Sequence, residues 1–219
     1  MQNEILIDIF RDPASREPRA RIGDVLSKFS MTAISGTLVL GCWIGFFAYW
    51  IINARRVKVT AERQSVWSAL AHRIPLGFSY YLLAAWYLPP TLNASVTSHA
   101  DWAIAMGGFI CVLGLFVTLW ARRTLAGNWS SDVTFKQGHE LIRRGPYRFV
   151  RHPIYTGLLT MGLGTAIEIG RLRGWVAMPL MMAALWLKLK QEEALMLRHF
   201  PDEYPDYRKR VKAIVPFVI

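Results

Sequence analysis

The chain has 219 residues, of which 53% are hydrophobic and 13% aromatic, and its formal net charge is +11 at pH 7. A soluble domain of this length is normally less apolar and closer to neutral, so these values indicate a small polytopic membrane protein. The basic residues flank apolar runs and are not gathered on one surface, so we expect no nucleic-acid partner. Cys42 and Cys111 fall within apolar runs, and no Cys/His cluster has zinc spacing, so we expect no metal.

Two apolar runs in the first half of the chain are predicted to cross a membrane. Residues 1–28 precede them as a polar, basic leader that is expected to lie at the membrane surface. Residues 29–52 carry no charge and are long enough to span the bilayer. A second span is predicted over residues 67–88, where Pro75 marks either a kink or the true helix start.

Three more apolar runs follow. Residues 102–120 form the third predicted span, and Arg122 and Arg123 stop it on the inner side. Residues 153–169 and 175–189 are shorter, and the Gly-Arg-Leu-Arg-Gly sequence between them predicts a tight turn in an antiparallel helical hairpin. After the hairpin the chain becomes a charged, aromatic tail.

Glycine pairs within the apolar runs predict close helix packing. Gly41 and Gly45 form a small-xxx-small pair, for which packing within the monomer is expected before a dimer contact. Gly162 and Gly164 lie within an apolar helix and not after a strand, so we interpret them as packing residues. The sequence therefore predicts no doubly wound cofactor domain.

These runs predict an all-α integral membrane protein of the inner (cell) membrane, with about five transmembrane helices and a C-terminal helical cap in the cytoplasm. We treat residues 1–219 as a single membrane domain and expect a monomer. Five spans place the basic N-terminus outside, against the positive-inside tendency. Two explanations remain open: the leader is an exported exception, or one span, of which the second is the weakest, does not cross.

The most distinctive segment is residues 144–157, Arg-Gly-Pro-Tyr-Arg-Phe-Val-Arg-His-Pro-Ile-Tyr-Thr-Gly. Such polar groups are costly at a membrane boundary unless they have a function. Pro153 suits the first turn of a helix and pushes His152 out of the helical region, so His152 is presented at the mouth of the fourth span beside free helix N–H groups. Tyr155 lies one turn further in, and Gly157 permits close approach of another group. The alternative is a membrane-interface belt in which the arginines bind lipid phosphate.

A second polar cluster follows the last predicted span. On a continuing helix Lys188 and Glu192 are i,i+4 neighbours, and Glu193 lies beside them. Taken alone, the cluster is equally compatible with a solvated helix end. The aromatic and proline pattern of residues 200–207, Phe-Pro-Asp-Glu-Tyr-Pro-Asp-Tyr, favours instead a folded cap, without indicating what the cap covers.

The two separated motifs together, residues 145–157 and then Glu192-Glu193 with Phe200, Tyr204 and Tyr207, closely resemble the isoprenylcysteine carboxyl methyltransferase-like family of integral membrane methyltransferases. Phospholipid N-methyltransferases share the first motif. The resemblance covers about residues 115–219, which would form the methyltransferase core. It implies S-adenosylmethionine as methyl donor, bound on the cytoplasmic side between the last two spans and the C-terminal cap.

The resemblance also implies a set of site residues. The cofactor-binding candidates are Gly145, Pro146, Tyr147, Val150, Arg151, His152, Tyr155, Gly157, Glu192 and Glu193. The catalytic candidates are Arg122, Arg123, Lys188 and Glu192. Carboxyl-methylating members carry an arginine where this chain has Lys188, and lysine lacks the bidentate fork that fits a carboxylate. The sequence therefore predicts the methyl donor better than it predicts a carboxylate acceptor.

We expect a methyltransferase that acts on a lipophilic small molecule or lipid entering sideways from the bilayer. Aromatic residues of the first two spans are candidates for the entry route, with at least half expected to be ordinary packing or interface residues: Trp43, Phe46, Phe47, Trp50, Tyr80, Tyr81 and Trp86. An amine acceptor would need a base, for which His152, Glu192 and Glu193 are candidates. The alternatives are an NADPH-dependent membrane reductase of the sterol reductase type and a non-enzymatic membrane subunit.

Overall fold

The computed structural model describes residues 18–54, 60–63, 65–85, 87–97, 100–126, 129, 134–136 and 140–216. For residues 18–30, 60–63 and 134–136 it describes the backbone alone. Most of the predicted leader and the candidate route residue Trp86 therefore lie outside the described residues, while the end of the leader belongs to a long first helix.

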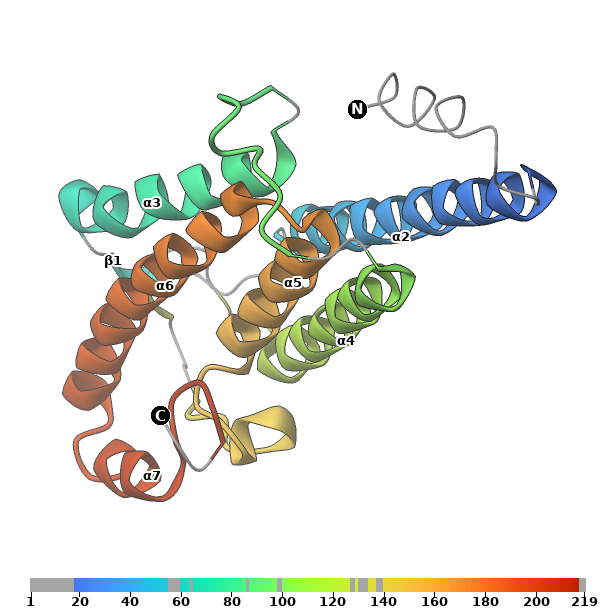
Figure 1. Ribbon diagram of the computed structural model, residues 1–219. Coiled ribbons are helices and arrows are strands. Elements are labelled where there is room, and N and C mark those ends of the chain that lie inside the picture. Colours follow the sequence, from blue (N-terminus) through green and yellow to red (C-terminus); the bar gives the residue numbers. More distant parts are fainter. Residues whose placement is uncertain are drawn as a thin grey trace.

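The described residues are almost entirely helical (Figure 1). Their six α-helices are α2 (Pro18–Asn53), α3 (Val66–Ala84), α4 (Asp101–Leu125), α5 (Pro153–Ile169), α6 (Leu172–His199) and α7 (Tyr204–Arg210). A short 3-10 helix, η2 (Gly145–Arg148), precedes α5. Two short strands that the sequence did not indicate, β1 (Thr60–Arg63) and β2 (Thr134–Lys136), pair antiparallel with Thr60 opposite Lys136.

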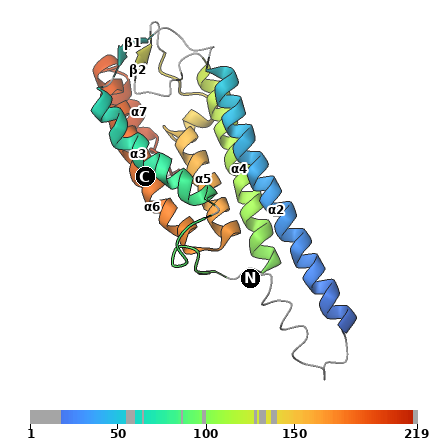
Figure 2. The same ribbon diagram turned by 90° about the horizontal axis from the view of Figure 1, so that it is seen from above.

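The helices form a curved bundle in which α5 lies between α4 and α6 (Figures 1 and 2). Helix α2 packs along the outer side of α4, and α3 packs against α6. The bundle closes where aromatic side chains of α2 and α3 meet, with the ring centroids of Trp43 and Tyr80 5.4 Å apart. The space next to the first turn of α5 is therefore enclosed by α2, α3, α4 and α6.

The contact between α4 and α5 depends on glycine. Four glycines lie where the two helices meet: Gly107, Gly114, Gly157 and Gly164. A Cβ atom on Gly164 would lie 2.5 Å from the backbone N of Cys111, and one on Gly114 would lie 2.5 Å from the backbone N of Met161. The two backbones are therefore too close for side chains at these positions, and the packing role predicted for Gly164 is confirmed.

Among the described residues, Gly41 and Gly45 do not take the packing role predicted for them. No atom lies within 4 Å of a Cβ built at either position, among the residues that the structure describes. The buried side chains of this part of α2 are those of Cys42 and Phe46, which lie on the face toward the bundle. The glycine pair therefore faces outward.

Three described helices are long and apolar enough to cross a membrane: Met31–Asn53, Asp101–Leu125 and Leu172–His199. The other two predicted spans form α3 and α5, which fall outside this set. Helix α5 has 17 residues, which corresponds to about 25 Å, shorter than the hydrocarbon core of about 30 Å. An integral membrane fold with helical spans is thus supported, whereas the number five stays a prediction.

The hairpin turn is confirmed, but the helix after it is longer than expected. Helix α5 begins at Pro153 and ends at Ile169, and Gly170 adopts the left-handed conformation, φ 63°, that ends the helix. Helix α6 then runs without interruption to His199. Lys188, Glu192 and Glu193 therefore lie on a continuous helix and not in a separate tail.

The C-terminal segment returns to the start of α5. The backbone N–H of Arg151 donates to the carbonyl of Lys212 at 2.8 Å, and that of His152 donates to the carbonyl of Ala213 at 2.9 Å. The hydroxyl of Thr156 donates to the carbonyl of Ile214 at 2.7 Å. The first two bonds satisfy the N–H groups of the two residues before α5, and the third joins a hydroxyl of its first turn to the same segment, so the tail fixes the backbone around His152.

Candidate functional site

A cavity of about 320 Å3 opens where the start of α5 faces α6. One wall is apolar and aromatic and comes mainly from α2 and α3; it contains Phe46, Phe47, Trp50, Leu76 and Tyr80. The other wall is polar and comes from the motif before α5, from α5 and from α6; it contains Tyr147, Arg151, His152, Tyr155, Lys188 and Glu192. We call this cavity the central pocket.

His152 is held where a helix begins. It is the residue before the first turn of α5, with φ −124° and ψ 61°, and Pro153 takes the first helical position, as the sequence predicted. Its imidazole stacks on the ring of Tyr155, with centroids 5.2 Å apart and planes 6° apart. The proline and the stacked tyrosine therefore fix both the backbone and the ring of His152.

Two carboxylates face the imidazole of His152 from α6. Nδ1 lies 3.5 Å from Glu192 Oε2, and Nε2 lies 3.5 Å from Glu193 Oε1. Both distances are at the outer limit for a hydrogen bond, so the interaction is mainly electrostatic. Burial lowers the pKa of His152, but the two carboxylates outweigh this effect and raise the pKa above its ordinary value.

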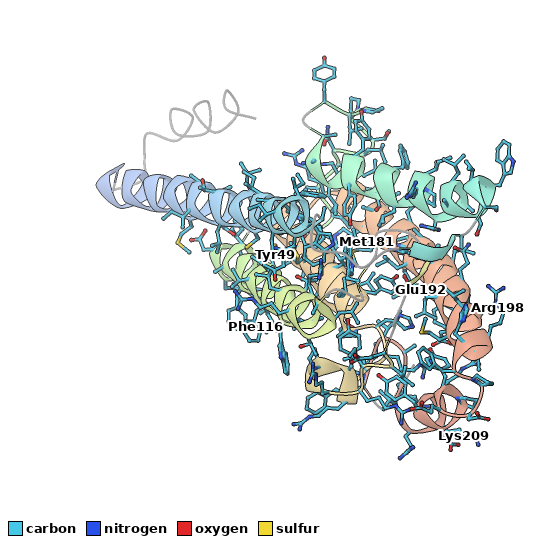
Figure 3. The ribbon with its side chains drawn as sticks, turned by 180° about the vertical axis from the view of Figure 1, so that it is seen from behind. Tyr49, Phe116, Met181, Glu192, Arg198 and Lys209 are labelled. Carbon is cyan, nitrogen blue, oxygen red and sulfur yellow. The ribbon has the colours of Figure 1, made fainter. Side chains whose placement is uncertain are left out.

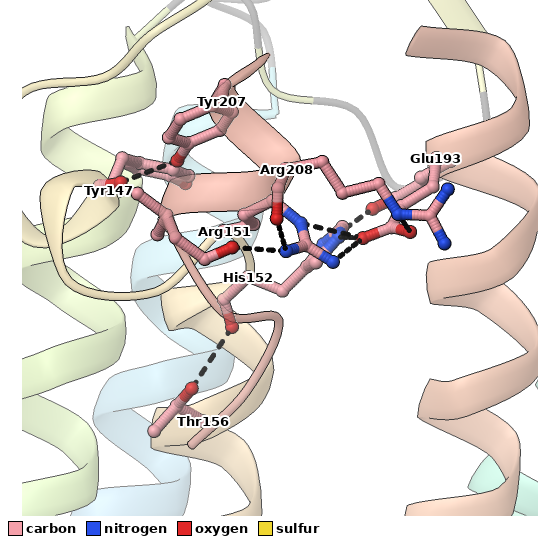
Figure 4. A network of polar contacts seen from close by, with 9 residues as sticks. Tyr147, Arg151, His152, Thr156, Glu193, Tyr207 and Arg208 are labelled. Carbon is pink, nitrogen blue, oxygen red and sulfur yellow. Dashed lines mark hydrogen bonds and ion pairs between the residues drawn. The ribbon is translucent and has the colours of Figure 1, made fainter. Parts of the chain in front are cut away.

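Glu193 is held by arginines and does not line the central pocket. Arg151 donates from Nε and Nη2 to Glu193 Oε1, at 2.9 and 2.6 Å, and Arg208 Nε lies 3.4 Å from Oε2 (Figure 4). Arg151 also donates from Nη1 to the carbonyls of Arg208 and Val211. This network joins α6, the motif before α5 and the C-terminal segment.

Glu192 differs from Glu193 although the two are adjacent. It lines the central pocket, and its Oε1 lies 3.9 Å from Lys188 Nζ, one turn earlier on α6. Lys188 Nζ lies 5.6 Å from the centroid of the Tyr155 ring. Glu192 lies toward the interior of the bundle, while Arg198 and Lys209 lie at its outer edge (Figure 3). Close to the ring of Tyr155 the pocket therefore carries the carboxylate of Glu192 and the basic groups of His152 and Lys188.

Helix α7 covers the motif before α5, as the aromatic pattern predicted. Tyr204 and Tyr207 are buried, and the hydroxyl of Tyr207 donates to the carbonyl of Tyr147. Burial raises the pKa of Tyr147 and of Tyr207, so both hydroxyls stay protonated at neutral pH. An exposed ion pair between Arg143 and Glu203 also joins the cap to this segment.

The arginines that end α4 do not line the central pocket. Arg122 donates to the carbonyls of Ala126, at 2.7 Å, and Asn53, at 3.2 Å, and its guanidinium lies 4.5 Å from the centroid of the Trp129 ring. Trp129 itself lines the pocket, so Arg122 supports a wall of it. Arg123 is exposed on the surface of α4.

Four further candidates position the backbone and do not line the pocket. Gly145 has φ 61° and packs against Thr124 of α4, and Pro146 is the second residue of η2. Val150 is buried and pairs with Lys212 in an isolated parallel bridge. Gly157 was expected to allow close approach of another group, and the group that approaches it is the backbone of α4.

Part of the predicted aromatic route lines the central pocket. Phe46, Phe47, Trp50 and Tyr80 do so. Trp43 instead donates from Nε1 to Thr165 at 3.0 Å, and Tyr81 is half exposed on the outer face of α3. Sequence reasoning missed Trp129 as a pocket residue, because it stands outside both motifs and nothing in its neighbourhood marks it.

Together, the fold and the pocket define a class of protein: a helical membrane protein with a charged, aromatic cavity at one end of its bundle. Residues 102–203 match the family described as phospholipid methyltransferase. This match spans somewhat less than half of the chain, so the chain is similar to this family over that part.

Known relatives carry the name protein-S-isoprenylcysteine O-methyltransferase. The chain is 33% identical over 117 residues to the protein of that name from Schizosaccharomyces pombe, covering 51% of this chain and 48% of the relative. It is 29% identical over 123 residues to that of Tribolium castaneum, covering 53% and 43%. The chain thus spans about half the length of the relatives it matches.

The fold is also similar to a solved structure of a eukaryotic intramembrane Ras methyltransferase, an isoprenylcysteine carboxyl methyltransferase. The TM-score is 0.54 and the sequence identity 21%, covering 87% of this chain and 68% of that one. The similarity extends beyond the matched half of the sequence, so the shared feature is the membrane fold as a whole.

Proposed function

We propose that this protein is an S-adenosylmethionine-dependent membrane methyltransferase whose acceptor is a lipophilic small molecule or a lipid. One observation carries the proposal: His152, Tyr155, Lys188 and Glu192 come from separate sequence motifs and converge on one pocket with an aromatic wall. The similarity to membrane methyltransferases supports the reaction class, and the pocket supports the place where the reaction occurs.

The residues of the central pocket fit the proposed cofactor. The donor's amino-acid part carries an ammonium group, for which the carboxylate of Glu192 is the matching charge. Its carboxylate part is matched by the ammonium of Lys188, which lines the same pocket. Glu193 is already held by Arg151 and Arg208, so we assign it to structure and Glu192 to binding.

When bound, the cofactor supplies a methyl group on a positively charged sulfur, which is transferred by in-line displacement. The chain's own contribution is alignment and the exclusion of water. The aromatic wall from α2 and α3 removes water from one side, and the helix start at Pro153 fixes His152 on the other. An amine acceptor must lose a proton, and His152 in its neutral form would take it.

The acceptor site is proposed along the apolar wall. Phe46, Phe47 and Trp50 belong to α2, which is a candidate membrane span, while Leu76 and Tyr80 belong to α3. A lipophilic molecule that leaves the bilayer between these two helices would meet the polar wall without crossing water. The relatives' name specifies a prenylated cysteine, but Lys188 weakens the match to a carboxylate acceptor here.

We infer that the end of the bundle holding the central pocket faces the cytoplasm. Many of the described basic residues gather there, in the motif before α5, at the end of α6 and in α7. Such an excess of Lys and Arg marks the cytoplasmic side of a membrane protein. Selective labelling of a cysteine introduced at exposed Lys209, in intact cells and in inverted vesicles, tests this orientation.

A transfer assay tests the proposed reaction. The purified protein is incubated with S-adenosylmethionine carrying a tritiated methyl group and with a total lipid extract, and the radioactivity of the organic phase is counted. We expect label in that phase, and loss of it with Glu192→Gln. A parallel incubation with deuterated NADPH tests the reductase alternative: deuterium in the lipids, without methyl label, would replace the proposal.

A further inference from the structure

A second hollow, of about 240 Å3, lies on α6 next to the face that lines the central pocket. Four of its residues are spaced at i, i+3, i+4 and i+7 and so share one face of the helix: Trp186, Leu189, Lys190 and Glu193. The rest of its wall comes from Arg151 and from the C-terminal segment, which contributes Arg208, Lys212 and Ala213. We call this the basic hollow.

The basic hollow carries an excess of positive charge. Four basic side chains line it against one carboxylate, that of Glu193. This carboxylate is already engaged by Arg151, at 2.6 Å, and by Arg208, at 3.4 Å. The charges of Lys190 and Lys212 are therefore not balanced by an acidic residue of the hollow, which favours an anionic ligand.

The position of the hollow on α6 indicates what kind of anion it meets. It lies toward the C-terminal, charged end of the candidate membrane span Leu172–His199. Trp186, which lines the hollow, is 37% exposed, and Met182, one turn before it on the same face, is 42% exposed. The face therefore changes from apolar to basic, with a tryptophan at the boundary, as at a bilayer surface.

Trp186 and Lys190 form the boundary itself. Lys190 Nζ lies 4.8 Å from the centroid of the Trp186 ring, so the cation is held over the ring and beside the hollow. A ligand there meets an indole, a fixed ammonium and the guanidinium of Arg208 within one recess. These groups suit a molecule with a phosphate head and an apolar chain.

We propose that the basic hollow binds the headgroup phosphate of an anionic phospholipid, with an acyl chain lying along Met182 and Trp186. The bound phosphate neutralises Lys190, Arg208 and Lys212, which belong to two separate parts of the chain. It thereby ties the C-terminal segment to α6 and stabilises the cap. The proposal does not depend on the methyltransferase function, since the hollow is separated from the central pocket by the Arg151–Glu193 pair.

The test uses the full chain purified in a neutral detergent. Its thermal unfolding is followed with added phosphatidylglycerol, phosphatidylcholine or inorganic phosphate, and lipid adducts are counted by native mass spectrometry. We expect phosphatidylglycerol to raise the unfolding temperature and to remain bound. Since each lysine near a membrane surface contributes on the order of 1 kcal/mol toward anionic lipid, the double variant Lys190→Gln/Lys212→Gln should bind phosphatidylglycerol about thirtyfold more weakly.

Lys209→Gln is the matched control, because Lys209 is exposed, pairs with Asp206 at 3.3 Å and lies outside the hollow. It should bind phosphatidylglycerol like the unchanged chain. Equal effects of phosphatidylglycerol and phosphatidylcholine on the unchanged chain would overturn the proposal without recourse to any variant. An equal effect of inorganic phosphate would show a free-anion site and overturn the lipid assignment, as would a double variant that still binds the lipid normally.

Discussion

Arg151 and Glu193 form an ion pair between the motif that precedes α5 and the second half of α6, 42 residues apart in the chain. Their side chains are 8% and 4% exposed, and both Nε and Nη2 of the arginine reach one carboxylate oxygen. Because Arg151 also donates to two carbonyls of the C-terminal segment, the pair fixes the cap against the start of α5. We therefore regard it as the structural support of the central pocket.

Removing the Glu193 charge should destabilise the protein strongly. Glu193→Gln leaves Arg151 buried without its counter-charge, which typically costs about 3–5 kcal/mol when one partner of a buried pair is lost. Thermal unfolding in detergent measures the change. The matched control is Glu203→Gln, which breaks the exposed pair with Arg143 and should cost no more than about 1 kcal/mol. Equal effects of the two variants would contradict a structural role for Glu193.

Alanine in place of Gly164 should disrupt the contact between α4 and α5. Its Cβ would meet the backbone of α4 at 2.5 Å, so the helices must separate. We expect a loss of about 1–3 kcal/mol, as for other overpacked cores, seen as a lower unfolding temperature. Gly41→Ala is the control, because nothing lies within 4 Å of a Cβ there, and it should be neutral or slightly stabilising. A similar loss at both positions would show that the close approach is not the cause.

The stability of the protein should depend on pH through His152. Its pKa is raised in the folded protein, so protonated His152 contributes stability that is fully present below about pH 6.5, the unfolded value, and is lost as pH rises through the folded pKa. The unfolding temperature of the unchanged chain minus that of His152→Asn should therefore fall as the pH is raised above about 6.5. A difference that grows with pH would mean that burial outweighs the two carboxylates.

Lys188→Arg should change the choice of acceptor more than the binding of cofactor. An arginine offers a carboxylate two parallel donors, which lysine does not. We expect the unchanged chain to methylate the prenylcysteine carboxylate of N-acetyl-farnesylcysteine poorly, and Lys188→Arg to improve this reaction, measured as base-labile methyl ester. Efficient esterification by the unchanged chain, with no gain in the variant, would show that Lys188 does not disfavour a carboxylate.

Local patterns predicted much of the fold. The proline before the fourth apolar run marked the first residue of α5, and the glycine after it marked its end. The end of α6 at His199 was not predicted, because the polar residues after the apolar run were compatible with a continuing helix of undefined length followed by a charged tail. In the fold these charges lie against the motif, so tertiary contacts extend the helix past the apolar run.

The sequence could not separate the roles of the two adjacent glutamates. Both matched one motif, and only the fold turns Glu193 toward Arg151 and Arg208 and Glu192 toward the central pocket. The same holds for Arg122 and Gly157, whose partners lie on other helices distant in sequence. The residue types indicated the chemistry of the site. Which residues face the pocket and which support it depended on packing between segments distant in sequence.

The most direct measurement of the central claim is calorimetric titration of S-adenosylhomocysteine into the detergent-purified protein. The unchanged chain and Glu203→Gln should bind with the same affinity. Glu192→Gln should bind about tenfold to a hundredfold more weakly, since it loses a charge-assisted hydrogen bond to the ligand's ammonium. Its unfolding temperature without ligand should fall less than that of Glu193→Gln, because the contacts of Glu192 with His152 and Lys188 are longer, at 3.5 and 3.9 Å. Absence of binding to the unchanged chain, or equal affinity in Glu192→Gln, would contradict the proposed site.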